Sequence, residues 1–206
     1  MAQDAIVRET SEWTSIWWDH ADDPASDRVL LIGDSISVGY TKTVIERLDG
    51  VARVDRLANS KGVNDPALYK EIGYMLAEHA YRVIHFNNGL HGWHIPDDVY
   101  ASSLKGMVQM LRWYSRGASL IWASSTPITA VDDPSALDAE KNPVVIRRNA
   151  IAREIMQSCD IPINDLYQVV LDRPELRSSD QYHFNPDGQT VQGEAVARIL
   201  LSLLTL

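Results

Sequence analysis

A serine, an aspartate and a histidine in this sequence have the types and spacing needed for acyl transfer. Ser35 follows the apolar run 28–32 in the tripeptide Gly33-Asp34-Ser35. Its hydroxyl is predicted to lie at a helix N-terminus, where free N–H groups and the helix dipole favour developing negative charge. Serine is also a common helix cap. Ser35 alone therefore leaves both interpretations open.

Asp180 and His183 are three residues apart, just before a predicted helix. One turn of chain can bring the carboxylate to the imidazole Nδ1 and leave Nε2 facing a serine. The carboxylate would then fix the tautomer and stabilise the imidazolium during proton transfer. The same spacing is also typical of a surface turn with a capping Asp. Only the combination with Ser35 indicates a nucleophilic site.

Short apolar runs alternate with amphipathic segments along the chain. Strands are predicted at 28–32, 51–57, 82–86, 119–123 and 161–163, and helices at 36–48, 66–79, 97–115, 144–158 and 188–204. This alternation indicates a parallel sheet with right-handed crossovers. We expect one domain over 28–206: a three-layer α/β/α sandwich around a central, mostly parallel five-stranded sheet. Ligands of such sheets bind beyond the carboxyl ends of the strands.

Residues 1–27 are expected to form an N-terminal arm packed on that domain. Trp13, Trp17 and Trp18 fall at i, i+4 and i+5, so one helical face could carry them, either as packing or as a substrate surface. The N-terminus lacks the basic and apolar regions of a secretory signal. This favours a cytoplasmic location, although a signal removed beforehand would leave the same sequence.

Composition excludes several partner classes. The 206 residues carry 19 Lys+Arg and 28 Asp+Glu, a net charge of −9, which argues against nucleic acid or an anionic membrane. No apolar run approaches the roughly 18 residues of a membrane span. Cys159 is the only cysteine, so an internal disulfide is impossible. The sequence gives no indication of the oligomeric state.

We expect no metal and no cofactor. His91 and His94 have i, i+3 spacing, but no third ligand is evident beside them. His85 alternates inside an apolar strand and is expected in the core. No G-x-G-x-x-G follows the first strand, and no G-K-[ST] occurs in the chain, so a nucleotide site is not predicted.

The joint pattern resembles the SGNH hydrolases, also called the GDSL-like esterase and lipase family. Their first block appears here as Gly33-Asp34-Ser35-Ile36, and their last block, D-x-x-H, as Asp180-Gln181-Tyr182-His183. Gly62 stands where the second block contributes a glycine. The resemblance covers roughly residues 28–204. It implies the flavodoxin-like SGNH hydrolase fold, with Ser35 as nucleophile, His183 as base and Asp180 orienting it.

The third block departs from the family's G-x-N-D, whose Asn side chain donates to the oxyanion. This chain has Asn87-Asn88-Gly89-Leu90-His91-Gly92 instead. Asn87, Asn88 or His91 could supply that donor, and Asn88 is favoured because it lies nearer the loop. The resemblance thus implies an oxyanion hole of Ser35, Gly62 and Asn88.

We expect a serine esterase for short acyl esters, with O-acetyl groups on a carbohydrate as the leading substrate. This choice follows the family's common activities, with His91 and Trp93 as candidate substrate-binding residues at the cleft mouth. The alternative enzymes are a lipase, a lysophospholipase or an acyl-CoA thioesterase. The altered third block instead favours a catalytically silent carbohydrate-binding relative.

Overall fold

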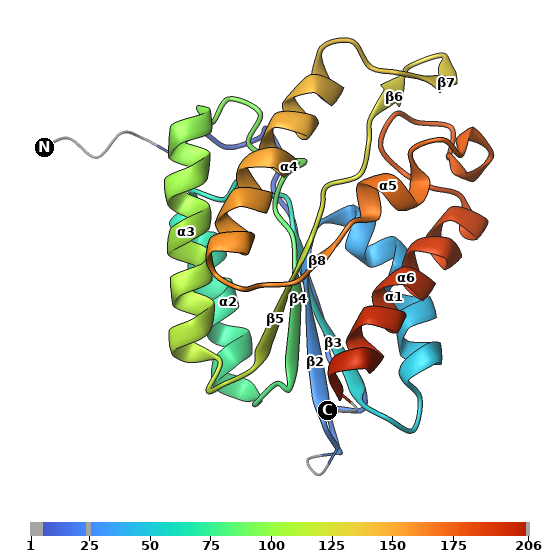
Figure 1. Cartoon of the computed structure of the whole chain (residues 1–206). Helices are drawn as coiled ribbons and strands as arrows, with labels where there is room; N and C mark the ends of the chain where they lie inside the picture. The colour runs from blue at the N-terminus through green and yellow to red at the C-terminus, as the bar shows by residue number, and fades with distance from the viewer. Residues whose placement is uncertain (1–5, 24–25, 205–206) are drawn as a thin grey trace, which may run out of the picture.

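The computed structural model describes residues 6–23 and 26–204, which form a three-layer α/β/α sandwich (Figure 1). Its central sheet has six strands in the order β1-β3-β2-β4-β5-β8. Their bounds are β1 Thr14–Trp17, β2 Arg28–Gly33, β3 Arg53–Asn59, β4 Val83–Phe86, β5 Ser119–Ala123 and β8 Ile163–Asn164. All neighbours pair in parallel except β1, which is antiparallel to β3. The predicted layers and the mostly parallel sheet are confirmed.

Helices cover both faces of the sheet (Figure 1). One face carries α2 Pro66–Glu78, α3 Asp97–Tyr114 and α4 Lys141–Ser158, and the other carries α1 Ser35–Leu48, α5 Leu166–Val170 and α6 Pro186–Leu204. The buried strand β2 shows why both faces must be covered. Leu30 and Ile32 enter one apolar core and Val29 and Leu31 the other, because successive side chains of a strand point to opposite faces.

The predicted count of five strands is wrong because β1 was missed. β1 is a four-residue edge strand with exposed residues at both ends, so it has no continuous apolar run. The predicted helical face of Trp13, Trp17 and Trp18 is also wrong, because these residues lie on strand β1 or directly beside it. Trp17 is half-exposed on β1, whereas the Trp18 ring packs edge-on against Tyr74 and His79. Residues 1–5 and 24–25 of the predicted arm lie outside the described residues.

The sequence also did not predict a small hairpin, β6 Thr129–Ala130 and β7 Asp133–Leu137, or the 3-10 turn Pro174–Leu176. Helix α4 begins at Lys141 rather than at residue 144. Pro143 is tolerated there because the first N–H groups of a helix have no intrahelical partner. Within the described ranges, no helix combines the length and apolarity needed to cross a bilayer.

His85 lies in the middle of the sheet on β4 and is fully buried, as predicted. The Asn164 side chain lies 3.2 Å from its Nε2. Burial lowers the pKa of His85 to about 3. The unfolded chain therefore binds a proton at His85 below about pH 6.5, where the folded chain does not.

We predict that His85 makes the protein less stable as the pH falls from about 6.5 toward 3. The unfolded state gains the proton first, so the free energy of unfolding drops by up to about 1.4 kcal/mol per pH unit. Urea titrations should show that, between pH 7.5 and 5.5, the free energy of unfolding falls by about 1 kcal/mol less in His85→Gln than in the wild type. The exposed His20→Gln is the control, and equal sensitivity in the two variants would contradict the assignment.

Candidate active site

The structure brings Ser35, His183 and Asp180 together at the carboxyl end of the sheet. Ser35 is the first residue of α1 and is separated from the end of β2 only by the N-cap residue Asp34. Its Oγ lies 2.8 Å from Nε2 of His183, and Nδ1 of His183 lies 2.8 Å from Oδ2 of Asp180. The three side chains thus form one chain of hydrogen bonds, although Ser35 and His183 are 148 positions apart in the sequence.

Asp180 is held as a carboxylate. Its Oδ1 accepts hydrogen bonds from the backbone N–H groups of Tyr182 and His183, at 2.8 and 2.7 Å. Partial burial raises the pKa of Asp180, but these bonds and the His183 ring outweigh it and hold the pKa at about 2. A carboxylate can only accept, so Nδ1 of a neutral His183 carries the proton and Nε2 accepts one from Ser35.

The loop that carries Asp180 and His183 is tied to the segment before α4. The Gln181 side chain donates to the carbonyl of Thr129 and to Oδ2 of Asp138, both at 3.0 Å. Lys141 donates to Gln181 Oε1 and to the Tyr182 hydroxyl, at 3.2 and 2.7 Å. Sequence reasoning missed this support. The position of Gln181 between the two catalytic candidates was its only available signal.

Two of the three predicted oxyanion donors are backbone N–H groups. Within the described residues, the N–H groups of Ser35 and Gly62 have no protein acceptor. Gly62 lies where the loop after β3 meets the loop after β4, and a Cβ there would lie 2.8 Å from Ile95 Cδ1 and 3.3 Å from Gly92 Cα. A larger residue there would require Ile95 to shift and would crowd the Gly92 backbone.

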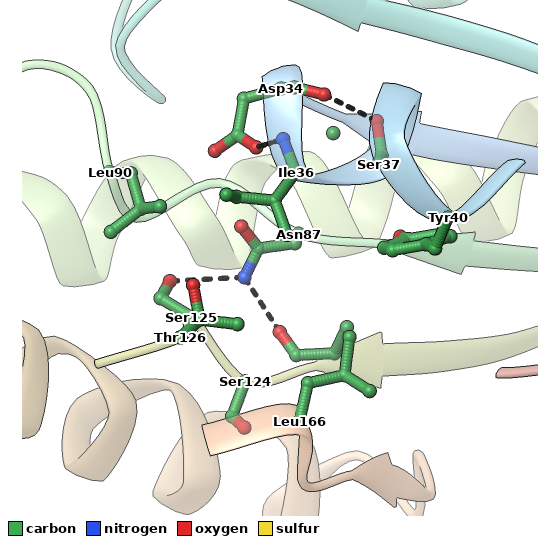
Figure 2. A pocket seen from close by; sticks show the side chains of 12 residues that line it. Asp34, Ile36, Ser37, Tyr40, Asn87, Leu90, Ser124, Ser125, Thr126 and Leu166 are labelled. Carbon is green, nitrogen blue, oxygen red and sulfur yellow. Dashed lines mark hydrogen bonds between the residues drawn. The ribbon is translucent and has the colours of Figure 1, made fainter. Parts of the chain in front are cut away.

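The two adjacent asparagines of the third block have different surroundings. Asn87 lines a cavity of about 10 Å³ next to Asp34, and its amide donates to the Ala123 carbonyl at 2.7 Å and to Ser125 Oγ at 3.1 Å (Figure 2). Both of its amide hydrogens are therefore engaged. Among the described residues, the Asn88 amide donates one hydrogen bond, to the carbonyl of Lys61 at 2.8 Å. Asn88 thus keeps a second hydrogen beside Gly62 and stays the preferred donor.

A buried arginine that the sequence analysis missed fixes the loop after β4. Arg148 of α4 is 1% exposed and donates to the carbonyls of Gly89, His91 and Gly92, at 3.0, 3.0 and 2.6 Å. Its guanidinium also lies 5.5 Å from the ring centroid of Trp93. The half-buried Trp93 therefore packs against a cation. His94, in contrast, is exposed.

Groupings of three or more His, Cys, Asp or Glu side chains suited to a metal ion do not occur among residues 6–23 and 26–204. The chemistry available in the site is that of a serine hydroxyl, an imidazole, a carboxylate and amide donors.

Comparisons with known proteins show the fold. No protein-family model matches the chain, and a search of curated proteins found no significant match. Among solved structures, Est24, a carbohydrate acetylesterase from Sinorhizobium meliloti, has a TM-score of 0.71 at 13% identity, covering 86% of this chain and 99% of its own. Axe2, an acetylxylan esterase from Geobacillus stearothermophilus, has a TM-score of 0.64 at 15% identity, covering 87% and 94%.

A third structure, a proposed SGNH hydrolase from Slackia heliotrinireducens, has a TM-score of 0.65 at 16% identity, covering 85% of this chain and 99% of its own. The chain therefore has the SGNH hydrolase fold, as the sequence motifs predicted. At these identities the likeness concerns the fold alone.

We predict that Arg148→Met lowers the free energy of unfolding by at least about 2 kcal/mol, because three buried carbonyls lose their donor. Chemical denaturation of the purified variant measures this loss. Arg147→Met is the matched control, since Arg147 is 54% exposed and forms a surface ion pair with Asp97. It should change stability by no more than about 0.5 kcal/mol. Equal effects of the two variants would contradict the role given to Arg148.

Proposed function

We propose that this protein is a serine esterase that hydrolyses short acyl esters. The observation that carries the proposal is the hydrogen-bonded chain from Ser35 through His183 to Asp180, at 2.8 Å for each step. This geometry allows a serine hydroxyl to lose its proton as it attacks a carbonyl. The esterase names of structures with the same fold agree with it.

In the proposed reaction, Ser35 Oγ attacks the ester carbonyl while Nε2 of His183 takes its proton. His183 then gives this proton to the departing alcohol oxygen, and an acyl-serine forms. Water attacks the acyl-serine with His183 again as base, which releases the acid and restores Ser35. Asp180 stays ionised throughout and stabilises the imidazolium formed in each half of the cycle.

The negative charge on the carbonyl oxygen is stabilised by the N–H groups of Ser35 and Gly62 and by the Asn88 amide. Amide donors fixed in place by the fold stabilise a developing oxyanion without reorganisation. Removal of one such donor typically costs about 2.7–4 kcal/mol of barrier. The bond from Asn88 to the Lys61 carbonyl holds this side chain beside the Gly62 peptide.

The leading substrate is an O-acetyl ester of a carbohydrate. The His183 and Asp180 side chains are 44% and 50% exposed, so the proposed site is open enough for a bulky alcohol part. The loops after β3 and β4 carry mainly polar side chains, which suit a hydroxyl-rich alcohol. Two structures with the same fold are a carbohydrate acetylesterase and an acetylxylan esterase.

We predict that Ser35→Ala lowers kcat/KM for 4-nitrophenyl acetate by at least about 1000-fold, since no other side chain can replace the nucleophile. The variant should stay folded, because Asp34 and not Ser35 caps α1, by accepting a hydrogen bond from the Ile36 N–H at 2.9 Å. Ser102→Ala, at an exposed position of α3, is the matched control and should keep wild-type activity. Retention of more than a few per cent of the wild-type rate by Ser35→Ala would exclude Ser35 as the nucleophile.

Acyl-chain preference should be short. A site bordered by polar loops gives little of the roughly 0.8 kcal/mol that each buried methylene gains against an apolar wall. We expect kcat/KM to fall along the series 4-nitrophenyl acetate, butyrate, octanoate and palmitate. A maximum at octanoate or beyond would favour the lipase and thioesterase alternatives.

A further inference from the structure

The N-terminal segment lies across the two loops that border the proposed site. Arg8 forms a bidentate ion pair with the Asp65 carboxylate, with N···O distances of 2.7 and 3.0 Å. Further along, Trp13 and Ser60 exchange two bonds: Trp13 N–H donates to Ser60 Oγ at 3.0 Å, and Ser60 N–H donates to the Trp13 carbonyl at 3.2 Å. The segment 8–13 is therefore anchored at both ends on the loop after β3.

Between these anchors, Glu9 reaches the other loop. Its Oε1 lies 2.7 Å from Nδ1 of His91, 82 residues away in the chain. A carboxylate only accepts hydrogen bonds, so Nδ1 of His91 donates to it. In the neutral ring Nε2 then carries a lone pair and no proton. A ring in this state can accept a hydrogen bond but cannot supply one to an oxyanion.

The His91 ring is fixed, and the residues on both sides of it reach the proposed site: Leu90 lines the cavity beside Asp34, and Gly92 packs against Gly62. Arg148 holds the His91 carbonyl, and Glu9 holds the ring. The His91 side chain is 18% exposed, so it is not sealed off from a ligand.

We infer that His91 binds a hydroxyl of the substrate's alcohol part through Nε2, and that Glu9 is the positioning residue that leaves this nitrogen free to accept. The inference rests on the proposed esterase function and sharpens its substrate class: esters whose alcohol carries a second hydroxyl near the ester. Under this assignment the N-terminal segment contributes to selectivity, and the neutral His91 ring cannot be the third donor of the oxyanion hole, which leaves that role to Asn88.

The test compares two substrates that differ only in hydroxyl groups: a mono-O-acetyl methyl xyloside and the same acetate with its remaining hydroxyls methylated. The quantity measured is the ratio of their kcat/KM values. We expect the wild type to prefer the hydroxyl-bearing ester. His91→Phe should lower this ratio about tenfold, mainly through KM, because one hydrogen bond is lost.

Glu9 tests the positioning role separately. Glu9→Ala should lower the ratio by a smaller factor, and the double variant with His91→Phe should match His91→Phe alone, because Glu9 acts only through that ring. Glu9→Gln should lie between Glu9→Ala and the wild type, since its amide oxygen can still accept from Nδ1–H. Glu154→Gln, at an exposed position of α4, is the matched charge control and should keep the wild-type ratio.

Three results would overturn the inference: a wild-type ratio near one, an unchanged ratio in His91→Phe, or additive losses in the double variant. Glu9→Ala changes a surface segment and keeps the test available if His91→Phe fails to fold. Failure of the proposed function is distinguishable, because the wild type would then hydrolyse neither ester in a Ser35-dependent manner.

Discussion

The hydrogen bond between Ser35 and His183 requires the first and last helices of the domain to pack with their N-termini at the same edge of the sheet. Helix α1 begins at Ser35, and α6 begins three residues after His183. Gly193 is the position that permits this packing. A Cβ there would lie 2.5 Å from Thr43 Cβ and 3.0 Å from the Tyr40 carbonyl, so a larger residue would push α6 away and move His183 from the serine.

The remaining parts of the site depend on loops that other elements hold in place. Arg148 of α4 fixes the carbonyls of the loop after β4. Gln181 joins the loop before α6 to Thr129 and Asp138, which lie in the connection between β5 and α4. The polar groups proposed to bind and react are therefore supported by buried or bridging side chains on separate elements. Such support keeps a site organised before a ligand arrives.

Much of the fold was predictable because the parallel strands are buried on both faces and appear as short apolar runs. β2 matched its predicted range at the start and ended one residue later. β1 could not be predicted, since a half-exposed edge strand has no such run. The residues Ser35, Asp180 and His183 were found because two of them are close in sequence and the third follows a strand.

The different surroundings of Asn87 and Asn88 were not predictable, for a physical reason. Asn87 and Asn88 are adjacent and chemically identical, and only the tertiary contacts show that the Asn87 amide is engaged by Ala123 and Ser125. The pair of Glu9 and His91 was equally hidden, because its members are 82 residues apart and have no periodic relation. Neither contact has a local sequence signal.

The proposed activation of Ser35 by His183 and Asp180 is measured most directly by covalent labelling with a fluorophosphonate, followed by mass spectrometry of the peptides. We predict stoichiometric modification of Ser35, and a labelling rate that falls by at least about 100-fold in His183→Ala, because the hydroxyl then lacks its base. Labelling at another residue, or an equal rate in His183→Ala, would contradict the claim.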